Sequence, residues 1–337
     1  MSNDRSTVAQ RDRIAQRTVT LVRGLEHDAC ILGLAISRLE NGATVIDCGA
    51  NAAGSWEAGR RITEISQGGM ASARLGVTEV AGVVLPEITV ESWSPVLSAY
   101  GLQVSVPLIE VGPAIRISGP ILARFADSPL GVPREELGGR AWGIGVIESD
   151  RLPEPRFAEA LASRSGLPAS DLTLIVVPAG TVAGATQIAG RINESVVFTI
   201  ERSLGIDCAC VSHLLGAAPV APAAAVAAPS TVTPDDLIHY AGRVVLTIDP
   251  EVGMDLADLA AQLTFRSTPI YGRRFGELLA DAGGVFEAIP GLVNLNKVAQ
   301  VTVIDRRTGD AFSAGERNES MLSGMYRTPG ARSEEAS

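Results

Sequence analysis

The chain has 337 residues, of which 46% are hydrophobic and 20% charged, and its formal net charge is −10. A chain of this length and composition can bury a sizeable core, so we expect a globular protein of one large domain or two ordinary ones. A nucleic acid or an anionic membrane surface would be repelled by the negative charge. The composition therefore argues against both as main partners.

The N-terminal part of the chain predicts two helices with a β-hairpin between them. The first helix is expected over residues 7–25, and the hairpin lies within residues 31–49. The pair Asn41–Gly42 suits a tight turn between its two strands. The second helix has Ser55 as its N-cap and ends before Gly68–Gly69.

The middle of the chain mixes β-rich runs and helical patterns in an irregular order. The expected elements are strands near residues 82–85 and 102–106, a turn at Gly119–Pro120, a strand over 142–149, a helix over 155–166, a strand over 172–178 and a helix from Gly184. Because helices and strands do not alternate strictly, the sequence predicts an α+β (mixed α/β) fold rather than a doubly wound sheet.

The C-terminal part begins with a run rich in alanine and proline at residues 214–234. Such a composition disfavours a regular strand or a long helix, so a loop or an extended cover is expected. A strand over 243–249, a helix near 273–280 and a hairpin over 300–316 follow. Thr308–Gly309 is expected at the tip of that hairpin.

The cysteines and the uncharged segments bear on metal binding and on location. The four cysteines, at positions 30, 48, 208 and 210, lack the paired spacing of a structural zinc site, so buried free thiols and no metal are expected. The first 30 residues lack the apolar core of a signal peptide. Two uncharged runs, 172–190 and 214–234, are interrupted by Gly and Pro. We therefore expect a cytoplasmic protein without a membrane span.

The common cofactor and hydrolase motifs are missing from the sequence. "GIGVIE" at residues 143–148 begins like a dinucleotide fingerprint, but Glu148 stands where the third glycine belongs. A phosphate-binding loop, a G-x-S-x-G elbow and an H-E-x-x-H pair are also missing, and the three histidines are isolated. A bound nucleotide is not expected.

The stretch "GATQIAGRINESVVFTIERS", residues 184–203, places a polar group on one face of a helix. At about 100° per residue, Gln187, Arg191 and Glu194 share an arc of roughly 60°, opposite an apolar side. This face could be exposed to solvent, with a weak Arg–Glu pair. It could also line a cleft, where an arginine holds a carboxylate that accepts a proton from water. Spacing does not decide between the two interpretations.

Several blocks of the sequence resemble one known family. The blocks are "LENGATVIDCGANAAGSWEAGRRITEISQGG", "VVPAGTVAGATQIAGRINES" and "GAAPVAP", and the similarity runs in order from about residue 39 to residue 316. The chain thus resembles the methenyltetrahydromethanopterin cyclohydrolases of one-carbon metabolism. A collinear set of ungapped blocks is more specific than any short motif.

This resemblance implies a two-domain subunit with a deep cleft between the domains, assembled as a homotrimer, with a pterin substrate and with neither metal nor nucleotide cofactor. We place the domains at residues 1–150 and 151–325, with a flexible C-terminal tail at 326–337. The arginine-rich composition together with these motifs indicates a bacterial member, one that oxidises formaldehyde in methylotrophy with a shortened tetrahydromethanopterin.

The catalytic R-x-x-E element of the family corresponds here to Arg191 and Glu194. Its chemistry is the attack of water on a methenyl carbon, so the resemblance implies that Glu194 takes the proton from water and returns it to the leaving nitrogen. Arg191 would favour the ionised carboxylate and hold its orientation.

Substrate contacts are expected from the same helix face and from loops of small residues, whose backbone can approach a flat pterin. The candidates are Gln187, Ser118, Gly119, Gly180, Thr181 and Gly69. Residues 216–222, in "GAAPVAP", are expected to form an ordered wall against the substrate. Each of these loops could also be an ordinary turn.

Two alternative functions stay open at this point. One is a pterin-binding protein without catalysis, and the other is a cyclohydrolase that uses tetrahydrofolate. A binding protein would need no base, so the presence of both Arg191 and Glu194 favours an enzyme.

Overall fold

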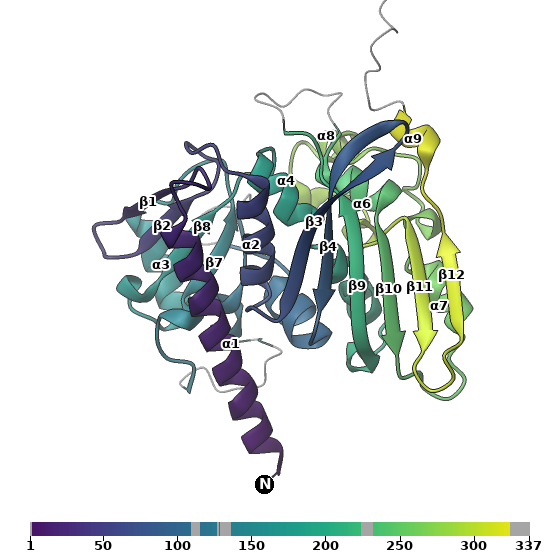
Figure 1. The fold of residues 1–337 in the computed structure, drawn as a ribbon, viewed down its shortest axis with the longest axis horizontal. Helices are drawn as coiled ribbons and strands as arrows, with labels where there is room; N and C mark the ends of the chain where they lie inside the picture. Colours follow the sequence, from purple (N-terminus) through teal and green to yellow (C-terminus); the bar gives the residue numbers. More distant parts are fainter. Residues whose placement is uncertain (1, 109–114, 127, 129–135, 224–231, 324–337) are drawn as a thin grey trace, which may run out of the picture.

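The computed structural model describes residues 2–108, 115–126, 128, 136–223 and 232–323 (Figure 1). Within these residues the chain forms nine α-helices and two mixed sheets of six strands each. The predicted α+β fold class is confirmed. The predicted tail at 326–337 lies outside the described residues. The predicted burial of the cysteines is confirmed for Cys48 and Cys208, whereas Cys30 is exposed and Cys210 is half-buried.

The first sheet has the strand order β1-β2-β8-β7-β6-β5. Strands β2, β8 and β7 are parallel, whereas β1, β6 and β5 pair antiparallel with their neighbours. The bounds are β1 Ala35–Arg38, β2 Thr44–Asp47, β5 Val106–Pro107, β6 Arg116–Ser118, β7 Ile144–Glu148 and β8 Thr173–Val176. The three parallel strands end at one edge of the sheet, where ligands are often bound in α/β folds.

The second sheet has the order β12-β11-β10-β9-β4-β3. Only the pair β10–β11 is parallel among its described strands. The bounds are β3 Ala71–Val80, β4 Val83–Ser92, β9 Val211–Pro219, β10 Arg243–Ile248, β11 Gln300–Asp305 and β12 Ala311–Gly315.

The helices stand against these sheets and between them (Figure 1). Their bounds are α1 Ser2–His27, α2 Trp56–Ser66, α3 Pro155–Ser165, α4 Val182–Ala189, α5 Ile192–Phe198, α6 Pro234–Ala241, α7 Leu256–Gln262, α8 Phe275–Asp281 and α9 Glu319–Ser323. Helices α2 and α4 approach very closely, since a Cβ on Gly59 of α2 would lie 2.5 Å from the Ala183 carbonyl of α4. Backbone contact of this kind requires glycine. None of the described helices is both long enough and apolar enough to cross a membrane.

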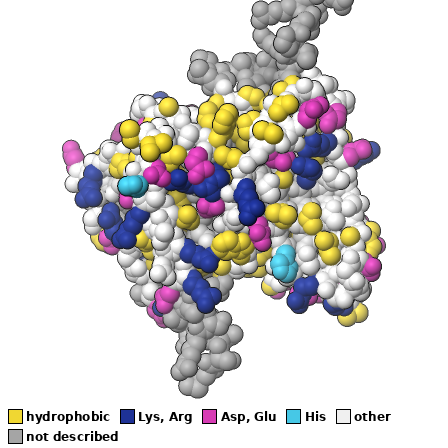
Figure 2. Space-filling view, in the orientation of Figure 1, with side chains coloured by type: hydrophobic (Ala, Val, Ile, Leu, Met, Phe, Trp, Pro, Cys, Tyr) yellow, Lys and Arg dark blue, Asp and Glu magenta, His cyan; other side chains and the backbone are white. Residues whose placement is uncertain are grey.

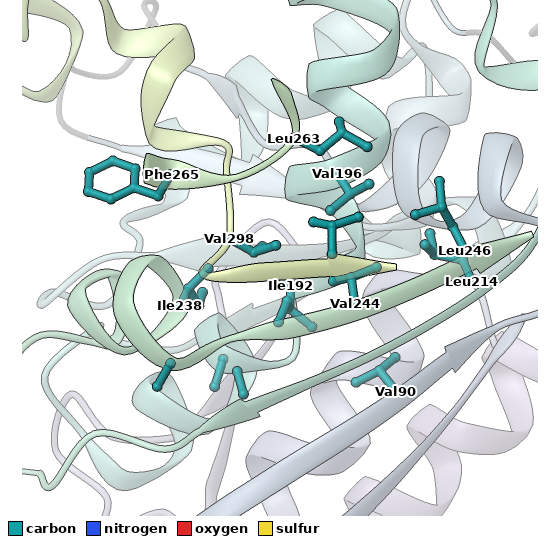
Figure 3. Close-up of a cluster of buried hydrophobic side chains, with 14 of the residues drawn as sticks. Val90, Ile192, Val196, Leu214, Ile238, Val244, Leu246, Leu263, Phe265 and Val298 are labelled. Atoms are coloured by element: carbon teal, nitrogen blue, oxygen red, sulfur yellow. The ribbon is translucent and has the colours of Figure 1, made fainter. Parts of the chain in front are cut away.

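The largest hydrophobic core lies between the second sheet and helices α4 to α7. Figure 3 shows side chains of α5 and α6 facing the sheet, and its labelled residues are Val90, Ile192, Val196, Leu214, Ile238, Val244, Leu246, Leu263, Phe265 and Val298. The apolar side of the predicted helix over 184–203 is therefore a core face. Its polar side must point elsewhere.

On the face that Figure 2 draws, basic and acidic side chains lie next to one another. Helix α2 illustrates this mixing, because Arg61 pairs with Glu57 at 2.7 Å and with Asp28 at 2.6 Å. Ion pairs that stay partly exposed, as these do, contribute little to stability. They do mean that this face presents interspersed charges rather than a field of one sign.

Several predicted elements are confirmed by the structure. Strands β1 and β2 form the expected hairpin around Asn41–Gly42, and β11 and β12 form the hairpin near Thr308–Gly309. The Ser55 side chain caps α2 by accepting a hydrogen bond from Ala58 N at 3.2 Å. After α2, Gly68 and Gly69 have φ values of 64° and 68°, which glycine adopts without strain.

In the first half of the chain, one strand lies where the sequence predicts no element, and one prediction is wrong. The unpredicted strand is β3, in which Arg74–Val77 are all exposed and show no alternation of buried and exposed residues. Residues 102–106 were expected as a strand, but Val96–Gln103 forms a π-helix and only Val106–Pro107 pairs in a sheet. Packing of Leu102 and its neighbours in a buried cluster prevails over their β propensity there.

The expectation for the segment 216–222 is also wrong in its first half. Residues up to Pro219 belong to β9, a central strand in which Gly216 pairs with Val90 and Val244. A Cβ on Gly216 would lie 2.4 Å from Asn193 Oδ1 of α5. The small residues therefore allow α5 to pack closely on the sheet, and residues 216–222 are not among those that line the cavity described below. Residues 224–231 lie outside the described part.

The two sheets are interleaved along the chain. Strands β3 and β4 lie before residue 150 and belong to the second sheet, whereas β8 lies after it and belongs to the first. The proposed division into domains at residue 150 stays a prediction.

Candidate active site

The predicted helix over 184–203 is interrupted at Gly190 and Arg191. Helix α4 ends at Ala189 and α5 begins at Ile192, with Arg191 between them at φ −86° and ψ 3°. A Cβ on Gly190 would lie 2.3 Å from Thr63 Oγ1 of α2, so only glycine fits at this contact.

The Arg191 guanidinium connects side chains and backbone from four separate segments. Its Nη2 donates to Glu194 Oε1 at 3.0 Å and to the Gln103 carbonyl at 2.9 Å. Its Nη1 donates to Glu148 Oε1 at 3.2 Å and to Ser118 Oγ at 3.4 Å. Charge-assisted hydrogen bonds of this kind fix both the arginine and its carboxylate partners.

Glu148 is the second carboxylate of this network. It ends β7, at the edge where the parallel strands of the first sheet terminate. Gln187 Nε2 of α4 donates to Glu148 Oε1 at 3.1 Å, so the amide and Arg191 bind the same oxygen. The arc of Gln187, Arg191 and Glu194 that the sequence predicts is therefore directed at the first sheet.

Glu194 is almost completely buried, with 7% of its surface exposed. Burial raises its pKa to about 7, although the adjacent Arg191 lowers it. Its Oε2 lies 2.8 Å from Arg191 Nη2 but at an angle that makes no hydrogen bond, and no described residue donates to that oxygen. A carboxylate with this pKa, one oxygen of which accepts no hydrogen bond, can exchange a proton near neutral pH.

A cavity of about 740 Å³ lies beside this network, which is an ordinary size for a small-molecule site. Arg191 and Glu194 form part of its lining. The other charged side chains around it are Arg116, Glu148, Asp150, Arg151, Asp235 and Glu287. An apolar wall comes from the segment after α7, with Phe275, Leu279, Phe286, Leu292 and Leu295.

Arg116 closes one side of the cavity. From β6 its Nη1 donates to Glu287 Oε1 at 2.7 Å, and its guanidinium lies 5.2 Å from the centre of the Phe286 ring. This ion pair links the first sheet to the apolar wall. The cavity therefore combines a polar end at Arg191 with an apolar surface on which a flat ring could lie.

The structure brings together some of the residues predicted to bind substrate. Gln187 and Ser118 both belong to the Arg191 network. Gly119 follows Ser118 with φ 101°, and its backbone N–H donates to the Leu102 carbonyl at 2.7 Å. Gly119 thus supports the turn that carries Ser118.

The remaining candidates lie elsewhere. Thr181 is the N-cap of α4, where its Oγ1 accepts a hydrogen bond from Gly184 N at 3.1 Å. Gly180 precedes it on the surface, and only Ala179 of this loop lines the cavity. Gly69 packs against Arg17 of α1, where a Cβ would lie 2.6 Å from the Arg17 Cβ. A substrate-binding role for these three residues stays a prediction.

Three functional candidates were missed in the sequence. Glu148 breaks the pattern of a nucleotide motif, but a carboxylate at the last position of a buried strand is itself a signal of a site. Asp235 resembles an ordinary acidic residue in the first turn of a helix. Gln103 contributes a backbone carbonyl, for which the sequence carries no signal.

Comparison with known proteins adds an independent finding. A family model described as Cyclohydrolase (MCH) matches residues 13–326. A methenyltetrahydromethanopterin cyclohydrolase of Methanococcus maripaludis strain C7 is 32% identical over 297 residues, which cover 86% of this chain and 91% of the relative. Proteins of the same name from Methanococcus vannielii and Methanothermobacter thermautotrophicus are 32% and 30% identical, each over 86% of this chain and over 91% and 92% of their own lengths.

Proposed function

The chain belongs to the methenyltetrahydromethanopterin cyclohydrolase family, and from this premise we propose that it hydrolyses methenyl-tetrahydromethanopterin to formyl-tetrahydromethanopterin. The observation that supports Glu194 as the base is the unsatisfied hydrogen-bonding capacity of its Oε2, which lies 2.8 Å from Arg191 Nη2 as an ion pair. That buried oxygen accepts no hydrogen bond from a described residue, and Glu194 lines a cavity large enough for a pterin.

In the first step, the oxygen of water forms a bond to the methenyl carbon. Glu194 Oε2 takes a proton from that water, so that the cationic amidine becomes a neutral tetrahedral adduct. In the second step, one of the two carbon–nitrogen bonds of the adduct breaks. Glu194 returns the proton to the leaving nitrogen while the adduct hydroxyl loses its own proton to solvent. The products are a formyl group on the other nitrogen and one released proton, and each step is reversible.

Arg191 has a positioning role in this mechanism. It donates a hydrogen bond to Glu194 Oε1 at 3.0 Å and forms an ion pair with Oε2 at 2.8 Å, and Oε2 can still accept a hydrogen bond from the water. Its positive charge opposes the effect of burial on the Glu194 pKa, so that a useful fraction of the carboxylate is ionised at neutral pH. Glu148 shares the charge of Arg191, which limits the repulsion between the guanidinium and a cationic substrate.

A direct test follows the loss of methenyl absorbance with purified protein. The methenyl derivatives of tetrahydromethanopterin and of tetrahydrofolate are compared at equal concentration. We expect rapid hydrolysis of the first and much slower hydrolysis of the second. Binding without hydrolysis would indicate a carrier protein, and equal rates would indicate that the pterin is not discriminated.

Other parts of the proposal concern the setting of the reaction. Water is the nucleophile and Glu194 the base, so the proposed chemistry assigns no step to a metal or a nucleotide. We expect a cytoplasmic homotrimer that serves formaldehyde oxidation, with the small pterin as its partner. Light scattering of the purified protein measures the number of subunits, and growth of a deletion strain on a one-carbon substrate tests the metabolic role.

A further inference from the structure

The carboxylates around Arg191 outnumber its single positive charge. One guanidinium serves two carboxylates, with Nη2 at 2.8 Å from Glu194 Oε2 and Nη1 at 3.2 Å from Glu148 Oε1. A third carboxylate, Asp235, lines the same cavity. It lies close enough to Arg191 and Glu148 to interact with their charges.

Asp235 is placed by the start of α6. Thr233 caps this helix, and the neighbouring Asp236 completes a capping box with it at 3.1 Å while also accepting from Phe275 N at 2.8 Å. Asp236 is therefore committed to the fold. The Asp235 side chain, by contrast, accepts no hydrogen bond from any other residue in the described part of the chain.

Apart from Arg191, the described neighbours of Asp235 in the cavity wall supply no positive charge. Ile238 and His239, one turn further along α6, line the cavity with it. His239 donates its Nε2–H to the Leu295 carbonyl at 2.8 Å, and burial lowers its pKa, so the imidazole is neutral. Of the other cations around the cavity, Arg116 is paired with Glu287 and Arg151 is exposed.

An ionised Asp235 carboxylate raises the free energy of the protein without ligand, because it has no hydrogen bond from another described residue. Asp235 is partly exposed at its surface, but its enclosure by the protein raises its pKa to about 7, with Asp236 and Glu148 adding to the rise and Arg191 opposing it. A positive charge placed in the cavity would offset that cost, whereas a neutral ligand would not. The substrate of the proposed reaction is a cyclic amidinium ion, and both its reduced parent and its formyl product lack that charge in the ring.

We propose that Asp235 binds the positive charge of the substrate, and that it makes the cavity prefer the cationic methenyl pterin to neutral pterins that share its ring and tail. This inference rests on the proposed function. It assigns Asp235 to recognition, and it leaves the proton transfer to Glu194.

The test compares two ligands in three proteins at pH 8, where the Asp235 carboxylate is ionised. The ligands are the methenyl pterin, measured by its KM, and the neutral tetrahydropterin with the same tail, measured by its inhibition constant. We expect Asp235→Asn to raise the KM about tenfold and to change the inhibition constant less than twofold, the scale of one partly solvated charge pair. Asp235→Glu should recover part of the loss.

The control is Glu159→Gln, which removes an exposed carboxylate on α3 outside the lining of the cavity and should change neither constant. If Asp235→Asn weakens both ligands equally, its role is structural and the inference is overturned. An unchanged KM overturns it as well. Should the wild-type protein hydrolyse nothing, the proposed function fails by itself, and calorimetric dissociation constants of the two ligands still decide whether Asp235 selects the cation.

Discussion

At the scale of single residues, the site depends on a difference in hydrogen bonding between the two oxygens of Glu194. One oxygen is held by Arg191 at 3.0 Å, and the other accepts no hydrogen bond from a described residue. Burial and the arginine act on its pKa in opposite directions, and the result lies near 7. A group with such a pKa is well suited to both take and return a proton at physiological pH.

Removal of this base should affect turnover more than binding. We expect Glu194→Gln to lower kcat by about two to four orders of magnitude with little change in KM, because an amide keeps the shape but cannot accept the proton. The measurement is the initial rate of methenyl loss. Glu159→Gln, on the exposed side of α3, serves as control and should behave as wild type. Near-normal turnover of Glu194→Gln would contradict the assignment.

Loss of the arginine should move the pH dependence of the reaction. Arg191 lowers the pKa of Glu194 against the effect of burial, so Arg191→Ala should shift the acid limb of the kcat profile to higher pH. Arg191→Lys, which keeps the charge, should shift it less. An acid limb at the same pH in all three proteins would mean that Arg191 only orients the carboxylate.

The same pKa has a consequence for stability. The folded-state pKa of Glu194, about 7, exceeds its ordinary value of 4.5, so wild type should lose stability relative to Glu194→Gln as pH rises through this interval. The shift corresponds to roughly 3 kcal/mol at most. Urea unfolding of both proteins at pH 5 and pH 8 measures it. A difference between the two proteins that stays constant with pH would show that the Glu194 pKa is not raised.

At the scale of elements, the decisive feature is the interruption between α4 and α5. Gly190 allows α2 to approach at Thr63, and Gly216 allows α5 to approach β9 at Asn193. Asn193 in turn donates to the Val90 carbonyl and to Ser92 Oγ, both at 2.9 Å. Arg191 and Glu194 are thus placed by a helix start that is fixed on two sides.

A side chain at Gly190 should therefore destabilise the protein. The added Cβ of Gly190→Ala would meet Thr63 Oγ1 at 2.3 Å, and overpacking of this kind costs about 1–3 kcal/mol. Thr63→Ala removes the two nearest atoms, so the double variant should lose less than the sum of the single variants. Gly276→Ala, where nothing lies within 4 Å, is the control in urea unfolding. If the losses of the two single variants add up in the double variant, the strain does not come from the contact between residues 190 and 63.

At the scale of the whole molecule, the two sheets exchange chain segments. Strand β2 pairs with β8, and β4 pairs with β9, so each pairing crosses residue 150. The cavity draws its lining from both halves of the chain, with Arg116 and Glu148 from the first and Arg191 and Asp235 from the second. The site exists only when both halves are folded together.

Separation of the halves should abolish folding of each. Residues 1–150 alone would leave β2 and β4 without their partners β8 and β9, and long-range pairing of this kind is not replaced by local contacts. We expect each fragment expressed alone to be insoluble or unfolded by circular dichroism, and co-expression to recover some soluble complex. An independently folded fragment 1–150 would instead support two sequential domains with a boundary there.

The sequence by itself determined the elements whose signals are local. Asn41–Gly42 forces its hairpin turn, Ser55 begins α2, and the spacing of Gln187, Arg191 and Glu194 places them on one polar face, because caps, turns and helical periodicity act within a few residues. Only the tertiary structure decided which residues contact that polar face. Arg191 binds Glu148, Ser118 and the Gln103 carbonyl, which lie in segments about 40 to 90 residues away. The helix break at Gly190 lies where α2 packs against it through Thr63. Sequence periodicity cannot distinguish a solvent face from a cavity wall, since burial depends on packing partners that are distant in the chain.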